Sequence, residues 1–381
     1  MAQMTRRERI LAASTGRMAD RVPFFHNWRH CQQGWAERDC RNRGMGLSWA
    51  RPSYTFTWHG VEVTETYESY TTAVQTLRRT FRTPVGTISQ VEKREAGYGQ
   101  WHGVRGWRDV TPWQTERAVK APEDYKVLKY MYDNLEIKPD YFGLEQAKDW
   151  LGEDGFVWDW VPHAGLQLLM IDWVGSEGGR FFVHHVRYPD AVEEAYQSIS
   201  KAYEPLWQIA AGSPADFFLL ADNLDAVLVN PKLFKKYFIP EWEKCCTALH
   251  AGGKLVGVHA DGRLAALKDL IPQTSIDVIE AFHVPQMGDL PLGEALKLWP
   301  EKVIWTGFPG SVYALGPEAT KKHALEMLRD IGTGERVCFE MSTENQVSNE
   351  NLLALTAVLE HATLPLTPEK IDEIERSLQL T

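Results

Sequence analysis

A His-x-Asp pair and later glutamates are the residues with which this sequence could do chemistry. His259 and Asp261 follow an apolar run directly, Glu280 closes the next one, and the last run offers Glu344 or, less favoured, Glu340. Gathered at one point, His259, Asp261, Glu280 and Glu344 could hold zinc through nitrogen and oxygen ligands. Such a metal would be a Lewis acid that polarises a bound oxygen, such as that of an ether. Without a metal, the same groups could serve as general acids, bases and hydrogen-bonding partners.

Further polar residues follow other apolar runs of the chain. Asp222 is a candidate catalytic residue, and the adjacent Asn223 is a candidate substrate contact; capping of the following turn is the alternative for this pair. His283, a little beyond the run that Glu280 closes, is another candidate substrate contact. Gly307 and Pro309 follow a later run and are candidates for contact with a cofactor.

Tryptophan is unusually frequent, with 15 residues in the chain. So many large indoles are hard to pack into one core, so some should lie near the surface or in a cleft. Trp28, Trp158 and Trp160 are therefore candidate contacts for a planar substrate, and ordinary core packing is the alternative. Arg29, next to Trp28, is a candidate contact for the same substrate.

The elements that would position these residues alternate between strands and helices. A capping-box pattern predicts a helix over residues 5–16. Most of the predicted strands are apolar throughout, as strands covered on both faces must be. They cover residues 22–25, 156–160, 181–183, 217–221, 254–258, 276–280, 303–305 and 337–339. The predicted helices between them cover residues 190–211, 231–252, 263–271, 292–298 and 317–331.

This alternation predicts an α/β fold, a (β/α)8 TIM barrel formed by one domain over residues 1–381. The active site of such a barrel lies at the carboxyl ends of its strands, where the candidate residues are found. Residues 50–118 have a different pattern, in which Thr, Val, Tyr and Trp alternate with frequent Gly. That pattern is typical of β-hairpins, and it predicts a β-rich insertion that acts as a lid or binds substrate.

Composition and charge exclude several functional classes. The chain has 381 residues and a net charge of −10, with a pI near 5.7, so we expect no nucleic-acid partner. No apolar run could span a bilayer and the first residues lack a signal peptide, so we expect no membrane association and a cytoplasmic protein. The five cysteines match no CxxC zinc spacing, and we interpret them as reduced, mostly buried thiols.

Over nearly its whole length, the chain resembles the uroporphyrinogen decarboxylase superfamily. The segments that carry the resemblance are residues 6–13, 20–23, 120–125, 221–223, 231–234, 253–262 and 349–352. Together these segments are specific for the superfamily, which contains true decarboxylases and corrinoid-linked methyltransferases. The resemblance implies a TIM barrel with these two activities as the alternatives.

Local residues favour one branch of that superfamily. True decarboxylases carry an Arg-Gln-Ala-Gly-Arg motif after the first strand, and of its arginines only Arg29 is present here. The methyltransferases bind zinc through His-x-Cys and a later Cys; His259 matches the histidine, and Asp261 stands where the first cysteine would be. This departure suits a branch that uses methyl ethers, because an oxygen leaving group needs an acid or a harder metal site.

The resemblance therefore implies the methyltransferase component of an anaerobic O-demethylase system. An aromatic methyl ether would be the small-molecule methyl donor, and cob(I)alamin on a partner corrinoid protein would accept the methyl group. The chain itself contains no Asp-x-His-x-x-Gly cobalamin-binding segment. The implied cofactors are zinc and the partner's cobalamin, and the oligomeric state, a homodimer included, is left open.

Two other functions are compatible with the sequence. A cofactor-free lyase, similar to the decarboxylases, could act on a tetrapyrrole or another carboxylated substrate through Arg29 and Asp222. A barrel without catalytic activity could bind only a tetrapyrrole or a corrinoid.

Overall fold

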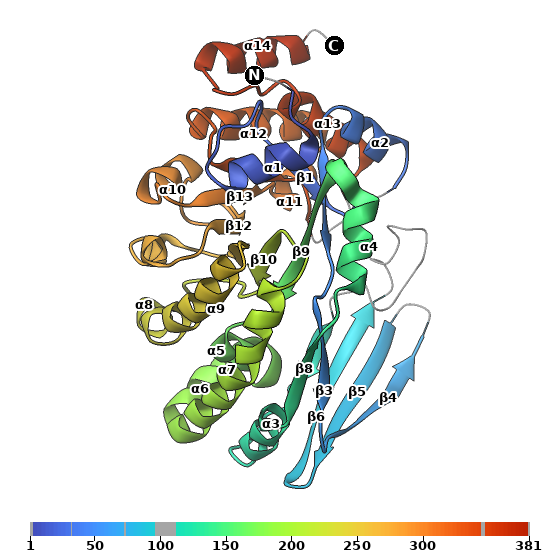
Figure 1. Cartoon of the computed structure of the whole chain (residues 1–381), viewed down its shortest axis with the longest axis vertical. Coiled ribbons are helices and arrows are strands. Elements are labelled where there is room, and N and C mark those ends of the chain that lie inside the picture. The colour runs from blue at the N-terminus through green and yellow to red at the C-terminus, as the bar shows by residue number, and fades with distance from the viewer. Residues whose placement is uncertain (1–2, 32, 72–73, 96–111, 344–346, 380–381) are drawn as a thin grey trace. The chain divides into compact units, whose positions relative to one another are not determined.

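The computed structural model describes residues 3–31, 33–71, 74–95, 112–343 and 347–379 (Figure 1). The chain forms two compact units. The barrel unit comprises Met1–Ser53, Tyr141–Val161 and Ser213–Thr381, and the second unit comprises Tyr54–Asp140 and Pro162–Gly212. All candidate residues that the structure describes belong to the barrel unit.

The barrel unit is a closed barrel of eight parallel strands, as the alternation of elements predicts. Around the barrel the strands follow the order β1, β14, β13, β12, β11, β10, β9 and β2, and β2 pairs with β1 to close it. Their bounds are β1 Phe24–Asn27, β2 Gly46–Ala50, β9 Gly155–Val161, β10 Phe217–Leu220, β11 Leu255–His259, β12 Val278–Phe282, β13 Val303–Gly307 and β14 Val337–Glu340.

Helices surround these strands, and Figure 1 shows α9, α10 and α12 on the outside of the barrel. The helices of this unit are α1 Arg6–Ser14, α2 Trp35–Asn42, α4 Phe142–Leu151, α8 Pro231–Leu233, α9 Ile239–Ala251, α10 Leu292–Leu298, α11 Gly310–Tyr313, α12 Pro317–Asp330, α13 Asn349–Leu359 and α14 Pro368–Gln379.

Helix α1 packs against the interior of the barrel and begins at the predicted capping box. The Thr5 hydroxyl accepts a hydrogen bond from the Glu8 amide, and the Glu8 carboxylate accepts one from the Thr5 amide. Ile10 of this helix joins a core cluster of early strand residues that includes Phe25 and Trp305, whose rings lie 5.1 Å apart. Because α1 packs on the early residues of the strands, the carboxyl ends are left for the site.

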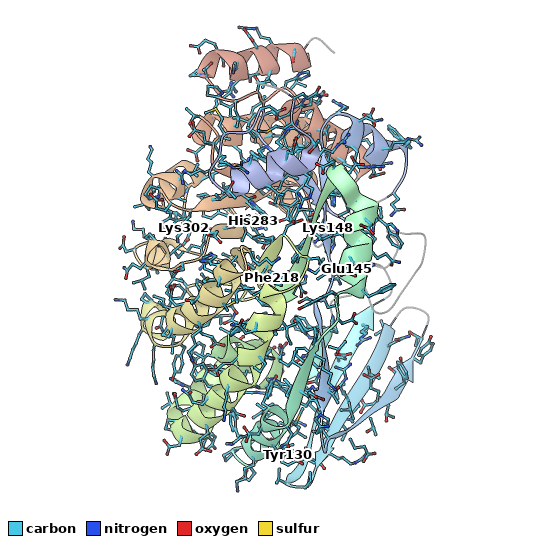
Figure 2. All side chains as sticks on the ribbon, in the orientation of Figure 1. Tyr130, Glu145, Lys148, Phe218, His283 and Lys302 are labelled. Atoms are coloured by element: carbon cyan, nitrogen blue, oxygen red, sulfur yellow. The ribbon has the colours of Figure 1, made fainter. Side chains whose placement is uncertain are left out.

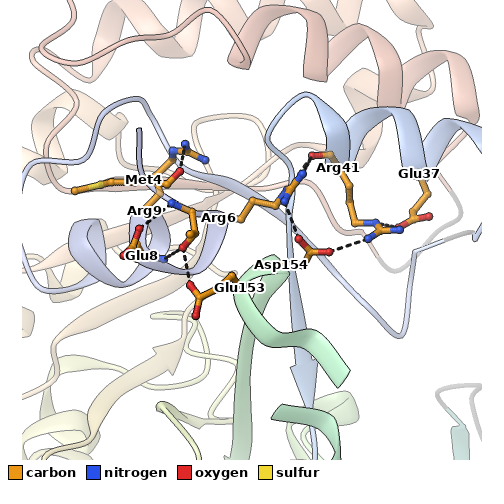
Figure 3. Close-up of polar contacts among 9 residues, drawn as sticks. Met4, Arg6, Glu8, Arg9, Glu37, Arg41, Glu153 and Asp154 are labelled. Atoms are coloured by element: carbon orange, nitrogen blue, oxygen red, sulfur yellow. Dashed lines mark hydrogen bonds and ion pairs between the residues drawn. The ribbon is translucent and has the colours of Figure 1, made fainter. Parts of the chain in front are cut away.

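Ion pairs attach α1 and α2 to the turn that precedes β9 (Figure 3). One Asp154 oxygen accepts a hydrogen bond from Arg6 at 2.7 Å, and the other accepts one from Arg41 at 3.0 Å. Arg41 also pairs with Glu37 within α2. These partly exposed pairs contribute little stability individually, but they fix the register of two helices against one strand.

The second unit combines antiparallel sheets with helices. One sheet has the order β4, β5, β6, β7 and the other pairs β3 with β8. The elements of this unit are β3 Tyr54–Trp58, β4 Glu62–Tyr70, β5 Val74–Thr83, β6 Gly86–Glu95, β7 Trp113–Glu116, α3 Asp124–Asp133, β8 Leu135–Pro139, α5 Gly165–Leu168, α6 Arg180–Arg187 and α7 Pro189–Ala211. The hairpins predicted within residues 50–118 are present, and whether they act as a lid stays a prediction.

Two element predictions were wrong. Residues 181–183, predicted as a strand, begin helix α6, where Phe181 and His184 are buried at helical spacing. Residues 263–271, predicted as a helix, form two short 3-10 turns, Ala265–Leu267 and Ile271–Gln273.

All five cysteines are buried and free. Within the described ranges, no helix combines the length and the apolar character needed to cross a bilayer.

Candidate active site at the carboxyl ends of the strands

The centre of the site is a hydrogen-bonded pair that joins two neighbouring strands. His259 is the last residue of β11, and the parallel register places it beside Glu280 of β12. The His259 Nδ1 and a Glu280 carboxylate oxygen lie 2.5 Å apart. The backbone continues this pairing, because the Ala260 amide donates to the Glu280 carbonyl at 2.9 Å. Glu280 is therefore positioned to orient the imidazole through Nδ1 and to leave Nε2 for other partners.

Asp261 faces the other ring nitrogen. Its carboxylate lies 3.5 Å from His259 Nε2, and its side chain is 44% exposed, compared with 21% for His259. Burial lowers the pKa of His259, but the charges of Glu280 and Asp261 outweigh it, so that this pKa lies well above its ordinary value. Burial raises the pKa of Asp261, and the interaction with His259 lowers it more, to below its usual range. We conclude that at neutral pH an imidazolium lies between two carboxyl groups.

Glu340, at the end of β14, is a buried acid close to this pair. Burial and the neighbouring Glu280 raise the pKa of Glu340 well above its ordinary value, which favours its protonated form. One of its oxygens is buried without a hydrogen-bond partner among the residues that the structure describes. The sequence offered Glu340 as the alternative to Glu344, and the preferred Glu344 lies outside the described residues. Two residues after Glu340, the Ser342 hydroxyl accepts a hydrogen bond from the Asn27 amide at 2.7 Å.

His283 and Gly307 meet on the neighbouring strand ends. Figure 2 labels His283, which lies just beyond β12. A Cβ atom added to Gly307, the last residue of β13, would lie only 2.7 Å from the His283 ring. The absence of a side chain at Gly307 thus makes room for the imidazole. Gly307 also pairs with Glu340 in the parallel register, and Pro309 precedes the short helix α11.

The predicted aromatic contacts fall into different environments. Trp160 is 37% exposed, and its ring stands edge-on to the His259 imidazole at 6.1 Å. Trp158 is 5% exposed and belongs to the barrel core, where it contacts Trp160 with ring centroids 4.7 Å apart. Trp28 stacks near Trp49 beyond the end of β1, and the adjacent Arg29 amide donates to the Asn27 side chain at 3.0 Å. Trp160 is thus the aromatic residue that the structure brings to the histidine.

Asp222 and Asn223 lie on the loop after β10. The Asp222 side chain is fully buried and accepts a hydrogen bond from the Trp242 indole of α9 at 2.6 Å. Asn223 adopts a positive φ of 41°, and the next residue, Leu224, donates its amide to the His259 carbonyl at 2.9 Å. This loop therefore supports the backbone of the His259 segment, and a catalytic role of Asp222 stays a prediction.

The described residues alone do not complete the predicted zinc site. Within them, no three or more His, Cys, Asp or Glu side chains are grouped so that they could hold a metal ion. The Glu280 carboxylate is hydrogen-bonded to His259 Nδ1. A carboxylate in this position orients a metal-binding histidine, and it is not itself a ligand of the metal. Because Glu344 lies outside the described residues, zinc stays a prediction, and we assign no chemical step to it.

Comparisons with known proteins support the barrel class. The fold is similar to that of a methyltransferase from Methanosarcina mazei, with a TM-score of 0.56, 13% sequence identity and coverage of 98% of this chain and 99% of that chain. A GH5-4 broad specificity endoglucanase from an uncultured bacterium gives a TM-score of 0.38 at 13% identity, with 63% of this chain and 85% of that chain covered. No protein-family model and no curated protein sequence matches the chain. At such low identity, the similarity to the methyltransferase structure establishes the fold alone.

Proposed function

We propose that the protein is a methyltransferase that demethylates a methyl ether, preferably an aromatic one, and passes the methyl group to a corrinoid protein. The observation that carries this proposal is the His259 ring, which lies between Glu280 and Asp261 at the carboxyl ends of the barrel strands. The similarity to the fold of a methyltransferase is consistent with it. Cob(I)alamin, bound to the partner corrinoid protein, supplies the nucleophile that accepts the methyl carbon.

The role of the protein's own residues is to bind the ether and to supply a proton. When the bond between oxygen and methyl carbon breaks, its electron pair stays on the oxygen, which must then take a proton. His259 Nε2 carries that proton, and Asp261 keeps it directed to the exposed side of the ring. A raised pKa suits this task for an aryl ether, because proton transfer is most efficient between groups of similar pKa, and a phenol is a weak acid.

Other residues of the site fix the geometry of this transfer. Glu280 prevents rotation of the imidazole, since it accepts the hydrogen bond from Nδ1. Trp160 offers an exposed indole beside the same ring, against which an aromatic substrate can pack. The raised pKa of Glu340 favours a neutral acid beside the pair that Glu280 forms with His259. The proposed site therefore combines the histidine, its two carboxyl partners and this acid.

The proposal is tested by mixing the protein with a reduced corrinoid protein and a panel of aryl methyl ethers. We expect the cob(I)alamin absorbance to disappear with at least one ether, and His259→Gln to slow this reaction by about a hundred-fold or more. Unchanged spectra across the panel, with a corrinoid protein shown to be active, would rule the proposal out. Release of carbon dioxide from a carboxylated tetrapyrrole, without methyl transfer, would support the lyase alternative.

A further inference from the structure

The second unit has a partly open cavity of its own. Its volume is about 730 Å³, within the range of pockets that hold small organic ligands. Every residue that lines it belongs to the second unit, from the segment between β3 and β7, from α3 and from the segment around Trp173. The chemistry proposed for the barrel gives this cavity no role.

One wall of the cavity is aromatic. Trp58 stacks on Phe81 with ring centroids 6.1 Å apart, and it lies 5.4 Å from Tyr132 and 6.2 Å from Trp173. The Trp173 indole donates a hydrogen bond to the Tyr132 hydroxyl at 3.0 Å, which fixes the orientation of both rings. Trp58 is half-buried, whereas the other three rings are buried. The wall is therefore rigid, and Trp58 is its accessible member.

The remaining lining is polar, and most of its charges are already paired. Arg94 pairs with Glu92, which is 2% exposed, and Arg79 pairs with Glu65 at 2.7 Å. Asp172 lines the same cavity, and within the described residues no hydrogen bond or ion pair is recorded for its carboxylate. Burial raises the pKa of Asp172 to about 6, although the charge of Arg117 lowers it. At neutral pH the cavity thus contains one carboxylate without a paired cation.

We propose that this cavity is a binding site for a small organic cation, a quaternary ammonium compound or a protonated amine, held by Asp172 and Trp58. A cation over an indole face is attracted by the quadrupole of the ring, and this attraction is stronger where water is excluded. A cation beside Asp172 would also compensate this half-buried carboxylate. A neutral ligand of the same shape would be attracted neither to the Trp58 ring face nor to the Asp172 carboxylate. The inference is independent of the activity proposed for the barrel.

The test is a calorimetric titration of the full chain with choline and with benzyltrimethylammonium. The control ligand is dimethylbutanol, the uncharged carbon isostere of choline. We expect choline to bind at least about ten-fold more tightly than the isostere, since only the charge differs. Asp172→Asn should weaken choline binding by about ten-fold or more and should leave binding of the isostere unchanged. The matched control is Asp190→Asn, an exposed position of α7 in the same unit, which should bind choline as the wild type does.

A second pair of variants keeps the test decisive if Asp172→Asn does not fold, as judged by circular dichroism. Trp58→Leu removes the π face and should weaken choline binding, whereas Trp58→Phe keeps a ring and should retain most of it. Equal affinity for choline and its isostere, no binding of either cation to the folded wild type, or full binding by both Asp172→Asn and Trp58→Leu would each overturn the proposal.

Discussion

The Nδ1 atom of His259 and a carboxylate oxygen of Glu280 lie 2.5 Å apart across two adjacent parallel strands. Both side chains are mostly shielded from water, with 21% and 8% of their surfaces exposed. Removing one partner of such a pair leaves the other charge buried and uncompensated. The pair is therefore a structural support and also the source of the charge that the proposed chemistry uses.

Glu280→Gln should destabilise the protein and slow methyl transfer. We expect a loss of about 3 kcal/mol in the free energy of unfolding, because the buried imidazolium loses its partner. Methyl transfer should fall by about a hundred-fold, because the imidazole is no longer held in one orientation. Denaturant unfolding and the cob(I)alamin absorbance measure the two effects. The matched control is Glu318→Gln, an 87% exposed partner of Lys321, which should change stability by less than about 1 kcal/mol. Equal losses in both variants would contradict the prediction.

The stabilisation from the ionised His259 should decrease as the pH rises. Its pKa is raised in the folded protein, so its contribution is complete below the unfolded pKa of about 6.5 and is lost as the pH rises through the folded pKa. We expect the difference in unfolding free energy between the wild type and His259→Gln to shrink steadily from neutral to alkaline pH. Urea unfolding over a pH series measures it. A difference that grows with pH would show that the histidine is neutral in the folded state.

Glu340→Gln should be tolerated near neutral pH. The pKa of Glu340 is raised by burial and by Glu280, so the folded protein holds the protonated acid, which glutamine resembles in shape and charge. The wild type loses stability as the pH rises from the unfolded pKa of a glutamate through the folded one, and the variant does not. We therefore expect the variant to gain relative stability with increasing pH, measured as the shift in the urea midpoint. Glu280→Gln, a carboxylate position of the same site, should lose stability and serves as the contrast.

Several parts of this site could be predicted from the sequence, because they depend on local pattern. The fully apolar run before His259 indicated a buried strand, and the parallel alternation placed its carboxyl end at the active site. The pairing of His259 with Glu280 could not be derived, because it requires the register between β11 and β12. The strand Gly46–Ala50 was missed because a glycine and a serine interrupt its apolar pattern.

The choice between Glu340 and Glu344 also depends on strand pairing, which the sequence does not show. Both follow one apolar run, and the sequence does not show that the paired strand β14 ends at Glu340. The wrong strand at 181–183 has a different cause. A run of three apolar residues fits a strand and one turn of a helix equally well, and the burial of His184 three residues after Phe181 decides for the helix.

Gly307→Ala should impair the site through His283. The new methyl group would lie 2.7 Å from one ring atom of His283, closer than non-bonded atoms approach, so the imidazole must move. We expect a loss of about 1–3 kcal/mol in the free energy of unfolding and a marked fall in methyl transfer. Gly310→Ala is the control, because its nearest contact, with Thr343, is an ordinary 3.7 Å. If both alanine variants behave alike, His283 is not fixed by the space at Gly307.

Trp242→Phe should reveal how strongly the Asp222 carboxylate depends on its indole partner. The indole donates to this fully buried carboxylate at 2.6 Å, and phenylalanine keeps the ring but removes the donor. Trp299→Phe is the matched control, because its equally buried indole donates at 2.8 Å to the neutral Lys268 carbonyl. A hydrogen bond to an ionised acceptor is about twice as strong as one between neutral groups, so Trp242→Phe should lose more stability, about 2 kcal/mol against about 1 kcal/mol. Thermal and denaturant unfolding compare the two variants. Equal losses would indicate that Asp222 is protonated in the folded protein, which would remove the charge that a catalytic role for Asp222 requires.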